Sequence, residues 1–439
     1  MDTNTVNTQT KTKFINNNMQ GTLPLTLERG TLVKILKQVL CDGFNEQTAT
    51  SISFDNDSKI AIIKLPSNHG FIPNQVISIT GSDSEIVNKE HRVFYTDSDS
   101  IRIKIPLLNS TTIGGILKLK VAPLGFSTVF NNINTTGIAC FQNKSQPPVI
   151  LKVIDALPPN GYDINWARYA RVVAGVVIDS EGNFINNEKI PKHSTFPDME
   201  ISGDGQTGGA AITSVMKWDY GLYRTTSYYG EETATGYYGD YPTSWRIIGD
   251  DKTFYLMIKP MGRNYGQYNI MSFGSYNSSA TDGDFILTGS QRDIRSDTSQ
   301  NGKSSVAWRS GFTNSNQSIG NFIYKNIYGA YNPWLNFKLI GLYTDEGTRQ
   351  WPSRWGCNPI NPMTGKIFTT PMYIKDDLGD MRGTLRGVEQ FYGIGKLTDG
   401  MLLNNGSSIV LTTKMFNWDW DSDEANPYLF SLKDWGETI

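Results

Sequence analysis

The feature of the sequence that most constrains its fold is a change in the spacing of apolar residues near position 50. Before it, apolar residues follow the i, i+3, i+4, i+7 spacing of one helical face: Leu32, Ile35, Leu36, Val39 and Leu40. After it, apolar and polar residues alternate in short runs such as Ile101–Ile105, as in half-buried strands. The sequence therefore predicts a mainly β fold with one short helix.

The first 50 residues are predicted to form a flexible arm followed by this amphipathic helix. Residues 1–22 are polar, and such arms often order only against a neighbouring molecule. Thr31 is predicted to cap the start of the helix, and Gly43 to stop it. We expect the arm and the helix to attach the chain to a neighbour.

Residues 51–121 are predicted to form a small β-barrel or sandwich domain, because short alternating runs follow one another with turn residues such as Pro73-Asn74 between them. The predicted strands are Lys59–Leu65, Gln75–Thr80, Arg92–Tyr95, Ile101–Ile105 and Gly115–Val121.

Residues 122–439 are predicted to form a larger β-sandwich-like region, since 439 residues exceed what one core usually serves. Ser244–Pro260 is expected to be a hairpin that turns at Gly249–Lys252. Further predicted strands are Val149–Leu157, Ala170–Asp179, Tyr268–Phe273, Asp284–Leu287, Phe337–Leu342, Lys366–Met372, Leu385–Gly395, Leu397–Leu403 and Ser407–Met415.

The composition of the chain limits which kinds of partner and which cellular compartment we expect for it. Lys and Arg number 40 against 42 Asp and Glu, and this balance favours neither nucleic acid nor an anionic membrane surface as a partner. Cys41, Cys140 and Cys357 are far apart and odd in number, which predicts reduced packing residues. With neither an apolar leader nor an apolar run of about 18 residues, we expect a chain assembled in the cytoplasm without a membrane helix.

No sequence motif points to catalysis, so we expect no enzyme, cofactor or metal site. The three histidines, His69, His91 and His193, lack a nucleophile motif nearby. Gly393–Thr398 lacks the spacing of a phosphate-binding loop. Asp419–Glu424 begins like a calcium loop, but Glu424 stands where that loop requires glycine.

Tyrosines and carboxylates lie close together in one loop, which leaves an alternative open. Glu231 and Glu232 follow Tyr228-Tyr229, and Asp240 follows Tyr237-Tyr238. Paired carboxylates can cleave a glycosidic bond, and aromatic rings can bind sugars. The same composition is typical of an adaptable protein-binding loop. We expect most of the ten tryptophans to be core or interface anchors.

Short segments between residues 30 and 412 follow one another in an order typical of a known family. The first is Thr31–Phe44, which ends in Cys41-Asp42-Gly43-Phe44. The others are His69-Gly70-Phe71, Val76–Gly81, Asn88, Arg92-Val93-Phe94, Lys120–Phe126, Val129-Phe130, Leu151–Asp155, Ala170–Gly175, Trp245–Leu256, Leu385-Arg386-Gly387 and Leu397–Gly400.

These ordered segments resemble a family of structural virion proteins of tailed bacteriophages and prophages, in which the small β domain is an insertion. The resemblance implies a virion component, usually tail-associated, and it brings no catalytic residues. Residues 186–240 and 417–439 depart from the pattern, and we interpret them as additions specific to this chain.

We therefore predict a structural subunit of a tail, baseplate or head–tail collar, present in a symmetric ring of copies beside other virion proteins. The alternatives are a receptor- or glycan-binding module for a host surface and, third, a glycan or peptidoglycan hydrolase. The candidate interface residues are Leu32, Ile35, Leu36, Val39, Trp218, Tyr228, Tyr229, Tyr237, Tyr238, Trp334, Trp351 and Trp355.

Overall fold

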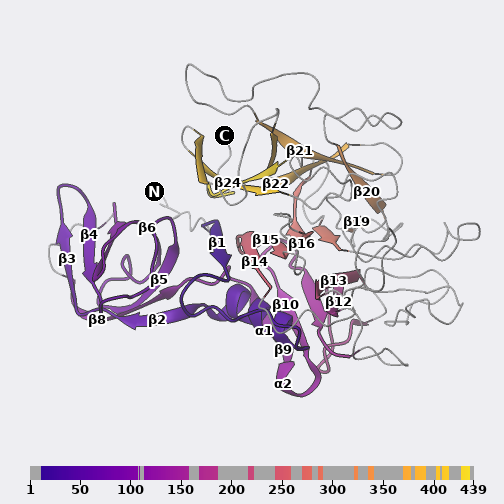
Figure 1. Cartoon of the computed structure of the whole chain (residues 1–439), viewed down its shortest axis with the longest axis horizontal. Coiled ribbons are helices and arrows are strands. Elements are labelled where there is room, and N and C mark those ends of the chain that lie inside the picture. Colours follow the sequence, from indigo (N-terminus) through magenta and orange to yellow (C-terminus); the bar gives the residue numbers. More distant parts are fainter. Residues whose placement is uncertain are drawn as a thin grey trace, which may run out of the picture.

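The fold is mainly β, as predicted, and it is built from antiparallel sheets (Figure 1). The computed structural model describes residues 11–106, 108, 113–157, 168–185, 216–221, 243–258, 269–278, 285–289, 321–324, 335–340, 369–376, 381–391, 402–405, 408–414 and 427–435. In these ranges, no helix is long and apolar enough to cross a membrane.

The predicted helix is confirmed, but its predicted cap is wrong. Helix α1 spans Thr31–Lys37 and continues as a π-helical turn, η1, over Gln38–Asp42, which ends at Gly43 with φ +73°. Gly30 occupies the N-cap position and Thr31 is already helical. The Thr31 hydroxyl donates backwards to the carbonyl oxygen of Glu28 at 2.6 Å, so it satisfies no helix amide. A second helix, α2, is one short turn over Ile133–Thr136.

The arm predicted to be flexible is ordered from residue 11 onward. Strand β1, Lys13–Asn16, pairs antiparallel with β14, Trp245–Gly249. Ile15 and Met19 anchor this segment in the core of the same chain. Residues 13–19 are therefore held within their own chain, while residues 1–10 lie outside the described part.

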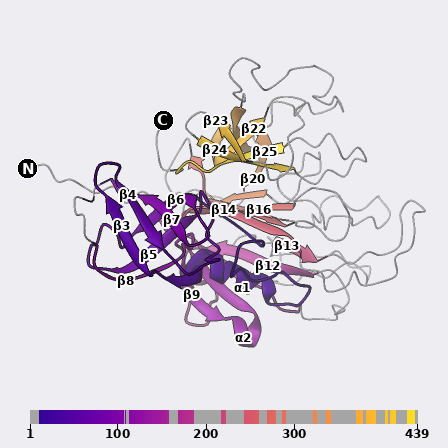
Figure 2. The same cartoon turned by 60° about the vertical axis from the view of Figure 1, so that its left-hand side comes forward.

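Seven strands between Phe44 and Val121 form one curled sheet, which lies to one side of the other sheets (Figures 1 and 2). All five strands predicted here are present. Two more polar strands, β2 and β3, were not predicted, because each has a single buried side chain, Phe44 or Phe54. The order is β2 (Phe44–Thr48), β8 (Gly115–Val121), β5 (Val76–Ser82), β6 (Glu90–Thr96), β7 (Ser100–Lys104), β4 (Ile60–Lys64) and β3 (Ser51–Asp55). The boundary predicted at residue 51 remains a prediction.

A five-stranded sheet follows along the chain. Its order is β13 (Met216–Gly221), β12 (Arg168–Gly175), β11 (Ile150–Ile154), β10 (Ile138–Gln142) and β9 (Ser127–Asn132). The predicted strands Val149–Leu157 and Ala170–Asp179 correspond to β11 and β12.

The largest sheet has thirteen strands and includes the predicted hairpin, β14 and β15. Beyond β1 and β14 it runs through β15 (Thr253–Ile258), β16 (Asn269–Ser275), β18 (Phe285–Thr288), β19 (Asn321–Tyr324), β20 (Leu335–Ile340), β21 (Thr369–Asp376), β22 (Met381–Phe391), β25 (Pro427–Ser431), β24 (Ser408–Lys414) and β23 (Leu402–Asn405), while β17 (Asn277–Ser278) pairs with β22.

Strands β14 to β16 lie between two hydrophobic cores. Leu256 and its neighbours on one face join the core that includes the helix and the five-stranded sheet. Tyr255 and Met257, on the other face, pack with residues of β21, β22 and β25. Figures 1 and 2 show β14–β16 between β12–β13 and β22. Burial on both faces explains why β15 is apolar along most of its length rather than alternating.

Candidate functional site

Five of the predicted interface residues lie in the chain's own core, which corrects that prediction. The side chains on the apolar face of α1 and η1 are fully buried: Leu32, Ile35, Leu36 and Val39. Trp218 is also fully buried, donates from Nε1 to the Thr288 carbonyl oxygen at 2.7 Å, and packs edge-on against Phe254. The helical pattern identified a buried face, but this chain rather than a neighbour covers it.

The other predicted interface residues and several weighed alternatives lie outside the described residues. These are Tyr228, Tyr229, Tyr237, Tyr238, Trp334, Trp351 and Trp355, together with Glu231, Glu232, Asp240, His193, Cys357, residues 393–398 and residues 419–424.

The two described histidines bond to backbone groups of the loops of the seven-stranded sheet. Nε2 of His69 lies 2.9 Å from the Asp97 carbonyl oxygen, and its Nδ1 accepts from the Phe71 amide at 3.0 Å. His91 contacts the Val87 carbonyl oxygen at 3.0 Å, and burial lowers its pKa. Both rings therefore hold loops of the seven-stranded sheet.

The described cysteines are thiols that pack inside the fold. Cys140 is fully buried, and Cys41 is partly buried. Burial raises the pKa of Cys41 to about 11, so its thiol stays protonated at neutral pH. A protonated thiol is a poor nucleophile, and this favours the packing role predicted for Cys41.

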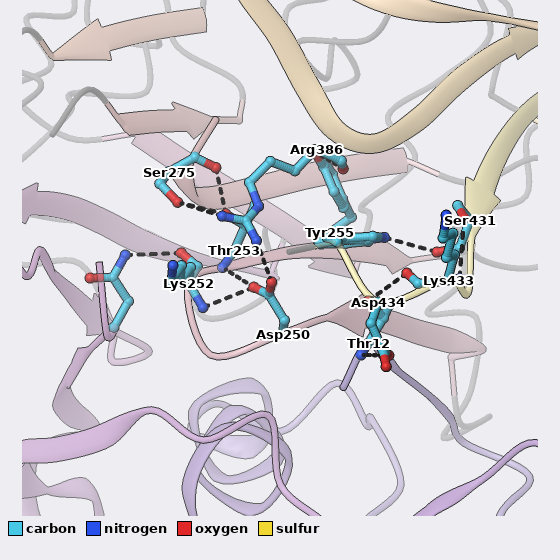
Figure 3. Close-up of polar contacts among 12 residues, drawn as sticks. Thr12, Asp250, Lys252, Thr253, Tyr255, Ser275, Arg386, Ser431, Lys433 and Asp434 are labelled. Carbon is cyan, nitrogen blue, oxygen red and sulfur yellow. Dashed lines mark hydrogen bonds and ion pairs between the residues drawn. The ribbon is translucent and has the colours of Figure 1, made fainter. Parts of the chain in front are cut away.

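A buried polar cluster joins the hairpin turn to the C-terminal strands (Figure 3). Oδ1 of Asp250 accepts hydrogen bonds from the Lys252 and Thr253 amides, each at 2.9 Å. Oδ2 of Asp250 lies 2.6 Å from Nη2 of Arg386, on β22. We call this cluster, Asp250, Thr253, Tyr255, Ser275 and Arg386, the polar clasp.

The remaining members of the polar clasp bond to one another. The Tyr255 hydroxyl donates to the Arg386 carbonyl oxygen at 2.9 Å, and Arg386 also reaches the Ser275 hydroxyl at 3.4 Å. Burial raises the pKa of Asp250, and the Arg386 guanidinium opposes that rise. Because both carboxylate oxygens have protein partners and the residue is almost fully buried, the clasp is suited to holding strands together rather than to binding a substrate.

A second buried carboxylate supplies the cap that α1 lacks. Asp155 follows β11, and its Oδ2 accepts from the Leu32 and Val33 amides at 2.9 and 3.2 Å. Its Oδ1 accepts from the Tyr220 hydroxyl at 2.6 Å. The first amides of a helix need such acceptors. Burial raises the pKa of Asp155, and these donors oppose the rise. The only sequence signal for this role is an acidic residue directly after an apolar strand.

An exposed pair of aromatic residues lies on the seven-stranded sheet. A β-bulge in β6 at Phe94 leaves both Phe94 and Tyr95 about two-fifths exposed. The Arg102 guanidinium lies 4.5 Å from the centre of the Tyr95 ring, and Nζ of Lys104 lies 5.9 Å from that of Phe94. We call these four residues the aromatic–cationic patch; sequence periodicity did not single it out.

Among the residues described, no group of three or more His, Cys, Asp or Glu side chains could hold a metal ion.

Comparison with known proteins finds a match only among solved structures. No family model matches the sequence, and no curated protein matches it. Among solved structures, the phage phi92 endosialidase matches over 88% of this chain and 52% of its own, with 9% identity and a TM-score of 0.16. The chain thus spans about half the length of that protein, and this score does not establish a shared fold.

Proposed function

We propose that the chain is a structural component of a tailed-phage particle, located in the tail, the baseplate or the head–tail collar. It acts by packing against further copies of itself in a symmetric ring and against other virion proteins. It performs no catalysis and needs no cofactor, nucleic acid or membrane partner.

The observation that carries this proposal is that the segments resembling phage virion proteins contact one another through buried polar groups. Asp155, in the segment Leu151–Asp155, caps the helix of the first segment at Leu32 and Val33. Asp250, in the hairpin segment, pairs with Arg386 of Leu385-Arg386-Gly387. These residues belong to segments that resemble a structural family, and they hold the fold together, which favours a structural role.

A third pair of these segments meets through the backbone. The Leu124 amide donates to the Val39 carbonyl oxygen at 2.9 Å, and the Phe126 amide to that of Leu40 at 3.0 Å. The segment Lys120–Phe126 is therefore bonded directly to the end of the helical segment. This contact also supports the proposal, because it joins two of the resembling segments into one hydrogen-bonded framework.

Molar mass measured by light scattering tests the proposal. We expect the purified 49.0 kDa chain to form a closed ring, with 3-, 6- or 12-fold symmetry, or to be a monomer that assembles only when other virion proteins are added. A chain that stays monomeric with every virion protein of its phage would contradict the proposal.

The aromatic–cationic patch favours one second candidate, a receptor- or glycan-binding module at the virion surface. Exposed aromatic rings beside cations are suited to carbohydrate or protein receptors. For this candidate, Phe94→Ala with Tyr95→Ala is expected to abolish binding of the purified chain to host cells. Ile116→Ala, at another exposed apolar position of the same sheet, is the matched control. Unchanged binding by the double variant would exclude the patch as the receptor site.

A further inference from the structure

We infer that the two ends of the described chain form a latch that Arg92 closes, and that this latch fixes the seven-stranded sheet against the thirteen-stranded sheet. The latch consists of Thr12, Arg92, Leu432, Lys433 and Asp434. It is a conformational device, independent of the proposed function, that can open at the two ends while the sheets stay folded.

Arg92 is the centre of the latch because it bonds to three separate parts of the chain. It lies on β6, and its Nη1 donates to the Asn74 carbonyl oxygen of its own sheet at 3.0 Å. Its Nη2 lies 3.0 Å from the Thr12 carbonyl oxygen, 3.4 Å from that of Leu432 and 3.1 Å from Oδ1 of Asp434. One guanidinium thus joins the seven-stranded sheet to both ends.

The two ends are also bonded directly to each other. The Thr12 amide donates to Oδ1 of Asp434 at 3.0 Å, and the Thr12 hydroxyl donates to the Lys433 carbonyl oxygen at 2.9 Å. Figure 3 shows Thr12 beside Lys433 and Asp434. Asp434 therefore accepts hydrogen bonds from Thr12 and from Arg92 at once. Loss of either Arg92 or Asp434 loosens the contacts among the N-terminal segment, the C-terminal segment and β6.

Strand β1 lies at the junction that the latch closes. It pairs with β14 of the thirteen-stranded sheet, next to the residues that bond Arg92. Nζ of Lys13 reaches across to Oε1 of Glu90, on β6, at 2.8 Å. Lys13 is almost fully buried, and this burial lowers its pKa while Glu90 opposes the change. The Lys13–Glu90 pair thus adds a second link between the same two sheets.

Solvent access distinguishes the latch from the polar clasp. The side chains of Arg92 and Asp434 are 28% and 20% exposed, whereas those of Arg386 and Asp250 are 10% and 3% exposed. Opening the latch leaves two charged side chains that water can reach. Opening the clasp would instead leave charged side chains buried in the core without partners. The latch is therefore the contact that can open while the sheets on either side stay folded.

Hydrogen exchange of the full-length chain, measured by mass spectrometry, tests this inference. We compare wild type with Arg92→Ala and Asp434→Ala, which open the latch from opposite sides. Arg102→Ala, on neighbouring β7, is the control for removing a cation from the same sheet. Charge-assisted hydrogen bonds correspond to roughly a tenfold to hundredfold change in opening. We expect that increase in peptides covering residues 11–16 and 427–435 in both latch variants, with β4, β5 and β7 unchanged.

Two results would overturn the inference. One is wild-type exchange at both ends in Arg92→Ala and Asp434→Ala. The other is an equal increase throughout the seven-stranded sheet, which would make Arg92 an ordinary stabilising residue. If Arg92→Ala fails to fold, Asp434→Ala and Arg92→Lys decide the matter. Lysine offers a single ammonium in place of the planar fork, so it should give an intermediate increase at the two ends.

Discussion

Replacing Arg386 by alanine is expected to lower the free energy of unfolding by about 3–5 kcal/mol, because it leaves the Asp250 carboxylate buried without its cation. The loss should depend on pH. Without the guanidinium, the largest influence that opposes burial is lost, so the pKa of Asp250 rises further above its value in the unfolded chain. The folded variant then binds a proton that the unfolded chain releases. Its deficit should therefore be largest near neutrality and shrink as the pH falls.

Denaturant unfolding at two pH values measures this effect. The control is the double variant Arg386→Met with Asp250→Asn, which removes both charges and keeps an oxygen for the turn amides of Lys252 and Thr253. Because neither partner is left charged, it should recover most of the lost stability. An Arg386→Ala variant within about 1 kcal/mol of wild type, a loss typical of a solvent-exposed pair, would show that the clasp does not hold the strands together.

Asp155→Ala is expected to cost about 3 kcal/mol or more. It removes the acceptor of two helix amides and of the buried Tyr220 hydroxyl, and buried donors without partners are costly. Asp155→Asn keeps one acceptor oxygen and should lose roughly half as much. Asp57→Ala, at an exposed acidic position, is the control.

Thermal unfolding followed by circular dichroism measures the Asp155 effect, and hydrogen exchange over residues 31–37 localises it. Burial raises the pKa of Asp155 above its unfolded value, so in wild type the contribution of this carboxyl group to stability falls as the pH rises through the folded pKa. Asp155→Asn should lack this dependence. Unchanged exchange over α1 in Asp155→Ala would contradict the capping role.

The strands that the sequence predicted well carry their own local signals. Gly115–Val121 alternates from Leu117 onward, and Ser244–Pro260 has a turn of glycine and aspartate between apolar runs. Strands β1 and β2 lack such signals, because each is short, at least half of its residues are polar, and it is held by pairing with a distant strand. Periodicity carries no information about such long-range pairing.

The candidate site could be predicted only in part for the same reason. Asp250 lay in a predicted turn and Arg386 in a recognised segment, but 136 positions separate them. The helix pattern identified the buried face of α1 and could not say which chain would bury it. Asp155 as a cap was missed, because sequence rules look for a cap next to the helix rather than 123 residues away.

The measurement that tests the central claim most directly is quantitative mass spectrometry of purified particles from the phage or prophage that encodes the chain, combined with antibody labelling in electron micrographs. We predict a fixed number of copies per particle that matches a ring, and labelling at one position on the tail, the baseplate or the collar. Particles that are complete, infectious and free of the chain would contradict the account.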